Sequence, residues 1–432
     1  EKYFMTFNII TLGCKVNQYE SQVMTEVMLK DGFTHSQDKD HADIFIVNTC
    51  TVTSVSDSKN RKLIRRIRRN NENAIIVVTG CMSQAFPEDE VYEICDIVVG
   101  NTNRKIISKL IKDYVANSDH YVNVEEHTGG EIFEPIKITN FEERTRAQIK
   151  IEDGCNRFCA YCIIPYARGR VRSKDINELK EEATDLASKC FREIVLVGIN
   201  LSCFGQDTNL NLCDAVETVA SVDGVDRVRL SSLEPERLDP EFIERLAKCD
   251  KLCPQFHLSL QSGCDETLKR MNRHYDTEEY RTIVNNLRKA FKDCAITTDV
   301  MVGFAGETEE EFQKSLDFVH SIKFAKVHTF SYSRRKGTVG DKLPNQVDPQ
   351  IKSERSKKMI EVTLKDRKEF LRNQLNNTYS VLFERKKEEG YWEGYTMNYT
   401  PVRVFSDLDL NDKIVDVKLT DAFDDYCIGE LI

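Results

Sequence analysis

The sequence lacks any hydrophobic run long enough to cross a membrane, although 40% of its 432 residues are hydrophobic. Residues 1–10 lack the basic start, apolar centre and small-residue cleavage site of a secretory signal. Internal repeats and low-complexity segments are also absent from the sequence. These absences argue against membrane-spanning, secreted and repeat proteins. We therefore expect a cytoplasmic globular protein with two or three domains, each with its own core.

An excess of positive charge is absent as well, since the formal net charge is −10. This charge argues against a protein that coats nucleic acid non-specifically, but it leaves room for a local basic site. Residues 59–69, KNRKLIRRIRR, contain seven basic residues and no acid, and their apolar residues fall on one helical face. Two interpretations stay open: a solvated helix face, or a surface on which Arg65, Arg66 and Arg69 contact RNA phosphates.

The first hundred residues alternate short apolar runs with helical patterns. The apolar runs predict strands at residues 7–12, 44–48, 74–79 and 97–99. Helical patterns lie between them, at residues 17–31 and 57–69. That alternation predicts a parallel sheet wrapped by helices. A polar connection at residues 117–143 follows and indicates a domain boundary.

A second alternating series begins near residue 147. It predicts strands at residues 147–152, 193–198, 227–231, 255–260, 295–302 and 326–332. Helical stretches separate these strands, for example at residues 178–189, 278–291 and 309–320. Six strand–helix units indicate an open, barrel-like α/β domain. A charged helix at residues 350–375 leads out of this domain, and the β-type patches of the last part of the chain are typical of a small all-β module.

Cysteine is abundant: the sequence has fifteen, and an odd number does not suggest an extracellular disulfide framework. The clearest motif is GCNRFCAYC at residues 154–162, directly after a predicted strand. It spaces Cys155, Cys159 and Cys162 as C-x3-C-x2-C. A structural zinc site would need four protein ligands, and the next cysteine, Cys190, lies beyond a predicted helix.

Three thiolates from one short loop can hold three corners of a 4Fe–4S cube and leave the fourth iron open. The amino and carboxylate groups of S-adenosylmethionine (SAM) can chelate such an iron. One electron then splits the sulfonium bond and gives a 5′-deoxyadenosyl radical. The motif and the six α/β units after it therefore indicate a radical SAM enzyme.

A second set of cysteines lies in the first predicted sheet. Cys14, Cys50 and Cys81 each follow the carboxyl end of a predicted strand, in TLGC, VNTC and VTGC. Those ends form the crevice where open parallel sheets bind ligands, so the three thiols are expected to converge. The alternative is three small buried residues at strand ends. Convergence predicts a second cluster with one open iron, so that one cluster generates the radical and the other presents sulfur to the substrate carbon.

Motifs along nearly the whole chain resemble those of the radical SAM methylthiotransferases. They are TLGCKVNQYES at residues 11–21, NTCTVT at 48–53, GCNRFCAYCIIPYARGRVRS at 154–173, SSLEP at 231–235, LQSGCDETLKRMNR at 260–273, TTDVMVGFAGETEEEF at 297–312 and FSYSRRKGT at 330–338. The resemblance implies an N-terminal α/β domain with an auxiliary cluster, a partial (β/α)6 radical SAM barrel and a small C-terminal all-β barrel called TRAM. The implied domains span residues 1–135, 144–370 and 371–432.

The resemblance also implies two 4Fe–4S clusters and SAM as cofactors, and tRNA as the partner. It assigns the SAM cluster to Cys155, Cys159 and Cys162. It assigns the auxiliary cluster to Cys14, Cys50 and Cys81. Four residues at strand ends that face the SAM cluster become candidate SAM ligands, with a buried structural role as the alternative: Glu234, Gln261, Arg273 and Asp299.

The residues after Cys14, Lys15 to Gln18, resemble the family branch that methylthiolates C2 of N6-threonylcarbamoyladenosine beside the tRNA anticodon. The alternatives are the isopentenyladenosine branch, the branch that modifies a ribosomal-protein aspartate, and a non-enzymatic iron–sulfur RNA-binding protein. A threonylcarbamoyl group carries a carboxylate, so its pocket should offer cationic groups. The candidates are Arg168, Arg170 and Arg172, with tRNA-backbone contact or simple solvation as the alternatives. The reaction also needs an electron donor and a sulfur donor, and the sequence identifies neither.

Overall fold

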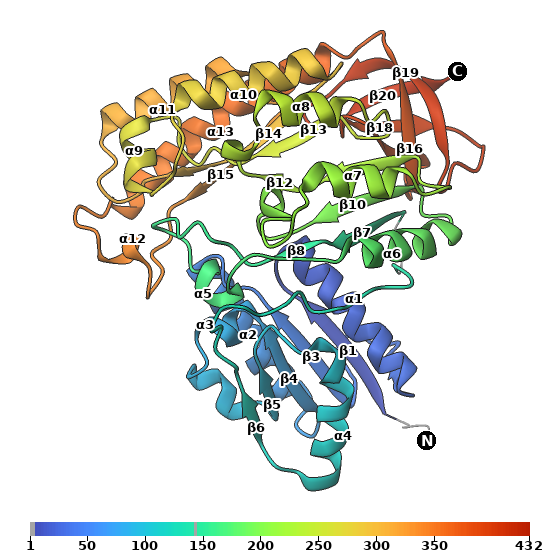
Figure 1. The fold of residues 1–432 in the computed structure, drawn as a ribbon, viewed down its shortest axis with the longest axis vertical. Helices are drawn as coiled ribbons and strands as arrows, with labels where there is room; N and C mark the ends of the chain where they lie inside the picture. Colours follow the sequence, from blue (N-terminus) through green and yellow to red (C-terminus); the bar gives the residue numbers. More distant parts are fainter. Residues whose placement is uncertain (1–4, 142–144) are drawn as a thin grey trace.

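The computed structural model describes residues 5–141 and 145–432, and Figure 1 shows three parts arranged along its longest axis. The N-terminal α/β part lies at one end, the barrel-like α/β part lies in the middle, and a small β-barrel packs beside the middle part at the other end. This arrangement confirms the predicted fold class. The predicted boundary at residue 144, and the first four of the residues inspected for a secretory signal, lie outside the described residues.

The N-terminal part is a six-stranded parallel sheet in the order β2-β1-β3-β4-β5-β6. Its strands are β1 (Thr6–Thr11), β2 (Thr34–His35), β3 (Ile44–Thr49), β4 (Ile75–Gly80), β5 (Ile97–Val99) and β6 (Tyr121–Asn123). Strands β3 and β4 are buried along their whole length, because their apolar, β-branched residues meet helices on both faces. The register pairs Asn48 with Thr79, so β3 and β4 end side by side.

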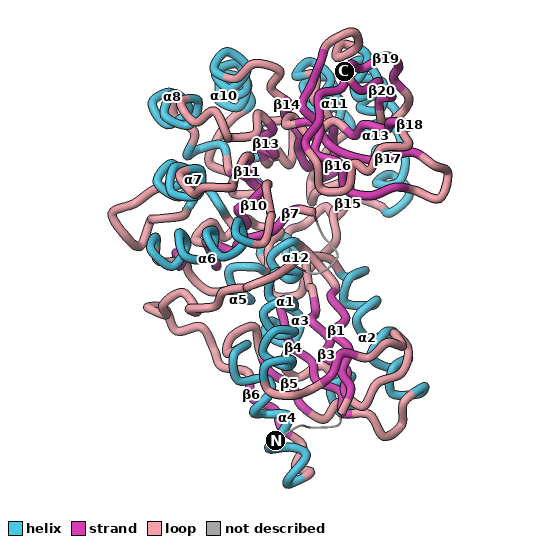
Figure 2. Tube along the Cα trace, turned by 90° about the vertical axis from the view of Figure 1, so that its right-hand side faces the viewer, coloured by secondary structure: helices cyan, strands magenta, loops and turns pink. Residues whose placement is uncertain are grey.

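Helices cover both faces of this sheet. Figure 2 shows α2 on the opposite side from α1 and α4. The helices of this part are α1 (Lys15–Lys30), α2 (Ser54–Asn70), α3 (Cys81–Ala85), η1 (Glu90–Ile94), η2 (Arg104–Ile106) and α4 (Ile107–Asn117). The basic helix α2 begins three residues before the predicted start. The reason is a cap, in which the Thr53 side chain accepts a hydrogen bond from the Ser56 backbone N–H.

The middle part contains seven strands, in two sheets ordered β11-β10-β7 and β12-β13-β14-β15. Six of them match the strands predicted for the second series, and the two-residue strand β12 is additional. The seven strands are β7 (Arg146–Lys150), β10 (Glu193–Val197), β11 (Arg227–Leu230), β12 (Ser232–Leu233), β13 (Gln255–Leu258), β14 (Ala295–Val302) and β15 (Lys326–Ser331). A bridge between Val228 and Leu252 connects the sheets into one curved wall. Two short antiparallel strands, β8 (Glu152–Asp153) and β9 (Arg172–Ser173), bracket the cysteine loop.

Helices pack on the outer side of this wall, as Figure 1 shows. The helices of the middle part are α5 (Ile164–Arg168), α6 (Ile176–Ser188), η3 (Leu201–Cys203), α7 (Leu212–Ala220), η4 (Pro235–Arg237), α8 (Pro240–Ala247), α9 (Asp265–Arg270), α10 (Thr277–Ala290), α11 (Glu309–Ile322), α12 (Val339–Lys342) and α13 (Pro349–Arg372). Two of them lie elsewhere: α5 packs against α3 of the N-terminal part, and α12 lies beside the cysteine loop. In β7, Ala147 and Ile149 join the core under the helices. Gln148 and Lys150 alternate with them and face the concave side, where the polar groups collect.

The C-terminal part is a closed barrel in the order β16-β17-β18-β20-β19. Its strands are β16 (Thr378–Lys386), β17 (Tyr391–Thr396), β18 (Pro401–Phe405), β19 (Ile414–Ala422) and β20 (Cys427–Leu431). The sequence patches gave no sign of β17 and β20, each of which contains a glycine. A Cβ on Gly394 would collide with the Leu382 carbonyl oxygen, and one on Gly429 with Val417, so tight barrel packing requires these glycines.

The β-barrel is attached to the middle part through buried arginines. Arg227 donates to the Tyr395 carbonyl (3.0 Å) and Arg229 donates to the Met397 carbonyl (2.9 Å). These bonds hold the barrel against the open edge of the curved wall. Within the described residues, no helix combines the length and the apolar character that a membrane span requires.

Candidate active site

The loop between β8 and β9 carries Cys155, Cys159 and Cys162. Gly154 starts the loop with a φ of +87°, and a Cβ at this position would collide with the Arg170 carbonyl oxygen. The two ends of the loop therefore lie so close together that only glycine fits at position 154. The Cys162 backbone N–H donates to the Cys159 carbonyl (2.9 Å), which forms a turn between the last two cysteines. The loop thus presents three thiols at the end of the first barrel strand.

The three thiols of this loop lie within electrostatic range of one another. Burial raises the pKa of Cys155 to about 12, and the charge of Cys159 adds to the shift. Burial raises the pKa of Cys162 as well, followed by the charges of Cys159 and Cys155. The charges of neighbouring thiolates thus disfavour ionisation of Cys155 and of Cys162, and a bound cation would offset this repulsion.

Cys14, Cys50 and Cys81 lie together at the carboxyl ends of β1, β3 and β4. Cys14 is the N-cap of α1, and Cys81 is the first residue of α3. A Cβ on Gly13 would lie 2.9 Å from the Cys50 Cβ and 3.2 Å from its Sγ, so Cys50 packs directly beside the Cys14 turn. Burial, then the charge of Cys81 and that of Cys14, raise the pKa of Cys50 to about 12.

Asn17 ties the first of these loops to the second. Its side chain donates to the Asn48 side-chain oxygen (3.2 Å) and to the Thr49 carbonyl (3.0 Å), and it accepts from the Cys14 thiol (3.3 Å). Gly80 has a φ of +109°, and a Cβ there would collide with the Thr49 carbonyl oxygen. The three loops are thus packed so closely that each thiol is fixed relative to the other two.

Each triad supplies three sulfur donors, the number that leaves one iron of a 4Fe–4S cube without a protein ligand. In residues 5–141 and 145–432, no group of three or more His, Cys, Asp and Glu side chains lies close enough to share a single metal ion. The fit to a cluster rests on the donor set: three thiols at each site, on turns whose glycines leave no room for a side chain.

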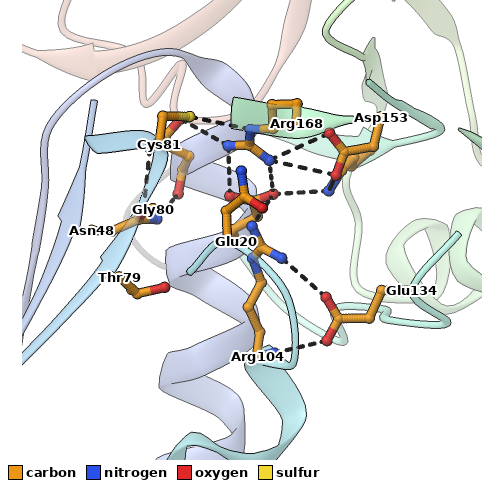
Figure 3. Close-up of polar contacts among 12 residues, drawn as sticks. Glu20, Asn48, Thr79, Gly80, Cys81, Arg104, Glu134, Asp153 and Arg168 are labelled. Atoms are coloured by element: carbon orange, nitrogen blue, oxygen red, sulfur yellow. Dashed lines mark hydrogen bonds and ion pairs between the residues drawn. The ribbon is translucent and has the colours of Figure 1, made fainter. Parts of the chain in front are cut away.

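Arg168, predicted as a candidate cationic group for a substrate carboxylate, lies in α5 after the cysteine loop and contacts the auxiliary triad. Figure 3 shows its guanidinium between Cys81 and Glu20. Its Nε donates to the Cys81 Sγ (3.2 Å), and its Nη1 is 2.5 Å from Glu20 Oε1. Burial opposes ionisation of Glu20, but Arg104, Arg168 and Lys150 outweigh it and lower the pKa of Glu20 to about 2. The Arg168 side chain is thus fully buried in an ion network and does not lie on a surface that a tRNA backbone could contact.

The other predicted RNA contacts divide between the interior and the surface. Arg172 is buried as well and donates to the backbone carbonyls of Arg168 (2.9 Å) and Arg170 (3.1 Å). Arg170 is exposed, and its guanidinium lies 4.7 Å from the centre of the Phe158 ring. On α2 the three arginines are exposed, with Arg65 in a surface ion pair with Glu90 (2.9 Å): Arg65, Arg66 and Arg69.

The four candidate SAM residues fall into two pairs. Arg273 donates to the Cys159 Sγ (3.3 Å) and is ion-paired with Glu234. Gln261 and Asp299 line a cavity of about 300 Å³ together with Cys162. Among the described residues, the buried Gln261 Oε1 has no hydrogen-bond partner, so this cavity offers an unused acceptor beside the cysteine loop. Val52 and Thr53, just after Cys50, also line this cavity, which places the auxiliary triad's loop next to it.

A larger cavity of about 690 Å³ lies where the three parts of the molecule meet, and we call it the interdomain cavity. Sequence reasoning missed it because its walls come from distant segments. Lys15 contributes from α1, Arg146 from β7 and Arg229 from β11. Desolvation, then Arg146 and Arg229, lower the pKa of Lys15 to about 8, so these cations face one another. The only signal in the sequence was the position of Lys15 next to Cys14.

Two family models match the chain. Uncharacterized protein family UPF0004 matches residues 6–100, and the Radical SAM superfamily matches residues 149–319. Among solved structures, the radical S-adenosylmethionine methyltransferase TsrM from Kitasatospora setae superposes with a TM-score of 0.58 at 15% identity. The superposition covers 78% of this chain and 77% of TsrM, and it is a likeness of fold.

Relatives match almost the whole chain. Threonylcarbamoyladenosine tRNA methylthiotransferase MtaB of Bacillus subtilis (strain 168) is 37% identical over 98% of this chain and 95% of its own length. The enzyme of the same name from Thermotoga maritima is 38% identical over 91% of this chain and 90% of its own. The tRNA-2-methylthio-N(6)-dimethylallyladenosine synthase of Clostridium botulinum (strain Loch Maree / Type A3) is 34% identical over 99% and 97%. With this likeness along its full length and two cysteine triads in place, the chain belongs to the radical SAM methylthiotransferase family.

Proposed function

We propose that this protein is a tRNA methylthiotransferase that adds a methylthio group to C2 of N6-threonylcarbamoyladenosine next to the anticodon. Enzymes of its family use two 4Fe–4S clusters and SAM. The observation that carries the proposal is the pair of cysteine triads, one in each α/β part, with Arg168 of the second part donating a hydrogen bond to Cys81 of the first. The substrate follows the two MtaB relatives, which are named for threonylcarbamoyladenosine.

Each triad has its own task in this proposal. Cys155, Cys159 and Cys162 hold the SAM cluster, and Cys14, Cys50 and Cys81 hold the auxiliary cluster. When bound, SAM and the two clusters supply the 5′-deoxyadenosyl radical that takes the hydrogen from C2, the sulfur that replaces it and the methyl group that caps the sulfur.

The protein's own side chains prepare these sites. Gln261 and Asp299 offer polar groups to SAM in the cavity beside Cys162. Arg273 and Arg168 each donate a hydrogen bond to one cluster cysteine, Cys159 and Cys81, and so stabilise that sulfur as a thiolate. Both donors are held by carboxylates, which fixes the direction of their hydrogen bonds.

The tRNA contact of this proposal lies on exposed cationic groups. Arg170 projects from the cysteine loop. Arg66 and Arg69 project from the last turns of α2, whose Arg68 contacts the residue before β4, so they lie at the edge of the sheet opposite to the auxiliary triad. The protein as a whole is acidic, so binding through these side chains would be local and salt-dependent.

Isopentenyladenosine is the second candidate substrate, and a specific observation favours it. The Clostridium botulinum relative named for dimethylallyladenosine aligns with 99% of this chain at 34% identity. The two substrates differ in polarity, since the isopentenyl group is apolar and the threonylcarbamoyl group carries a carboxylate. A cationic cavity favours the threonylcarbamoyl group.

Nucleoside mass spectrometry tests the proposal. The protein is expressed in a strain without its own methylthiotransferases, and bulk tRNA is digested and compared with that of the empty strain. The expected result is a new methylthio derivative of threonylcarbamoyladenosine. Appearance of the methylthio-isopentenyl product alone, or of a modified ribosomal aspartate with unmodified tRNA, would contradict the assignment to threonylcarbamoyladenosine.

A further inference from the structure

The interdomain cavity carries an excess of positive charge. Among the described residues, one acidic side chain, Glu384, lines it against four cationic ones. The cationic residues are Lys15, Arg146, Arg229 and Arg385. Glu384 is paired with Arg146 (2.7 Å), and Arg229 is paired behind the wall with Glu193 (2.6 Å). In the part of the chain that the structure describes, Lys15 and Arg385 have no ion-pair partner, so their charge is available to a ligand.

The same cavity offers a buried hydrogen-bond acceptor. Gln148 is 6% exposed, and its Nε2 donates to Gln18 Oε1 (3.3 Å). Its own Oε1 is buried and has no donor among the described residues. A buried acceptor without a donor destabilises the protein, and a ligand N–H or O–H would remove this penalty. The cavity thus combines a cation and an acceptor on neighbouring walls.

The geometry points to a binding site for the carboxylate-bearing substituent of the target adenine. Lys15 pairs with the carboxylate, and Gln148 Oε1 accepts from the hydroxyl or the urea N–H of the same substituent. This inference rests on the proposed function and names the residues that select its substrate. It replaces the predicted roles of Arg168 and Arg172, whose side chains point into the ion network instead.

The position of the cavity fits a substituent on the reacting base. Lys15 follows Cys14 directly, so a group bound by Lys15 lies next to the auxiliary triad that would deliver sulfur. The volume of about 690 Å³ is that of a small-molecule pocket. An isopentenyl group would leave both Lys15 and Gln148 without partners, and a pocket built for polar groups rejects ligands that lack them. A backbone phosphate is the other anion that could reach these cations, and the experiment separates the two.

The test measures binding by the anaerobically reconstituted full-length protein. The probes are two labelled anticodon stem-loop RNAs of one sequence, one with threonylcarbamoyladenosine and one with unmodified adenosine at the target position. Lys15→Met is compared with Lys357→Met, which removes an exposed lysine on α13 far from the cavity. Iron per chain is measured for every variant, because Lys15 adjoins Cys14. Arg385→Met is the second variant, since it alters the same cavity from the C-terminal barrel without touching a cysteine loop.

The expected result is a loss of at least tenfold in affinity of Lys15→Met for the modified stem-loop, with less than a twofold change for the unmodified one. Arg385→Met should lose affinity in the same selective way, and Lys357→Met should match the parent protein. Equal losses for both RNAs would assign the cations to backbone phosphate and overturn the inference. If both cavity variants still preferred the modified stem-loop as the parent protein does, the inference would also be overturned. The proposed function would nevertheless stand if the parent protein makes the methylthio product. A parent protein that neither discriminates nor modifies the base would overturn both.

Discussion

Both triads bring three cysteines together, but they differ in how the sequence does so. The triad of Cys155, Cys159 and Cys162 comes from one loop, so its spacing is written in eight consecutive residues. The triad of Cys14, Cys50 and Cys81 comes from three loops that only the parallel sheet brings together. The first site depends on local backbone geometry, and the second depends on the order and register of β1, β3 and β4. A cluster site can thus be encoded either by spacing or by topology.

The surroundings of the triads differ in a second way. Each triad has one sulfur that accepts from a buried arginine, Cys159 from Arg273 and Cys81 from Arg168. Arg273 is anchored within its own barrel, by Glu234. Arg168 instead belongs to the segment after the SAM cysteine loop and reaches across to the N-terminal part. The auxiliary site is therefore completed by the domain that carries the other site.

The largest effect is expected from removing each triad as a whole. The reconstituted protein should carry about eight irons per chain, as two four-iron cubes require. Changing Cys155, Cys159 and Cys162 to Ala should leave about four irons and abolish SAM cleavage. Changing Cys14, Cys50 and Cys81 to Ala should also leave about four irons, yet preserve cleavage of SAM to 5′-deoxyadenosine. Full iron content in the variant of Cys14, Cys50 and Cys81 would contradict the assignment of a cluster to these three cysteines.

Replacing each buried arginine with methionine should destabilise the protein to a different extent at the two triads. Arg168→Met leaves Glu20 fully buried with fewer partners, and breaking a buried ion pair costs about 3–5 kcal/mol. Arg273→Met should cost less, since Glu234 is only partly buried and can reach water. Urea unfolding of the iron-free protein measures the change in the free energy of unfolding for both variants. Arg65→Met, which breaks an exposed ion pair, serves as the control and should change this free energy by less than about 0.5 kcal/mol.

Iron analysis of the same two variants sharpens the comparison. Arg168→Met should lower the iron bound at the auxiliary site and leave the SAM site filled, while Arg273→Met should do the reverse. A variant of Arg168 that lost iron equally from both sites would show that the arginine stabilises the whole interface and not the Cys81 sulfur.

The smallest effect on the triads is expected from the exposed arginines of α2 and of the cysteine loop. Arg66→Glu with Arg69→Glu on α2, and separately Arg170→Glu on the cysteine loop, should leave iron content and stability unchanged, because these side chains are exposed. Each change should weaken tRNA binding and flatten the slope of log affinity against log salt, by about 0.7–0.9 for each lost phosphate contact. Unaltered binding at low salt would make the corresponding residues an ordinary solvated surface.

The sequence was sufficient for features that are encoded locally. The cysteine loop, the six barrel strands and the basic helix follow from spacing and periodicity, and all of them lie within a few residues of the predicted positions. Convergence of Cys14, Cys50 and Cys81 could also be inferred, because strand ends of a parallel sheet share one edge. These inferences needed no knowledge of distant partners.

The sequence was insufficient where a partner lies far along the chain. Arg168, Arg170 and Arg172 look alike in the sequence, yet only Arg170 faces solvent. What separates them is Glu20, which lies 148 positions before Arg168 and gave no signal in its predicted helix. The interdomain cavity was missed for the same reason, since three parts of the molecule must assemble before it exists.

The bond between Arg168 and Cys81 also sets an order of events during synthesis. Arg168 follows Cys81 by 87 residues, so at about 5–20 residues per second the ribosome needs roughly 4–17 s to supply it after the last auxiliary cysteine has been made. During that interval the nascent sheet exposes three thiols, and Glu20 gains its cationic partners one after another, with Arg168 as the last after Arg104 and Lys150. Loading of the auxiliary cluster is therefore expected to wait until the cysteine loop of the barrel has emerged and folded against it.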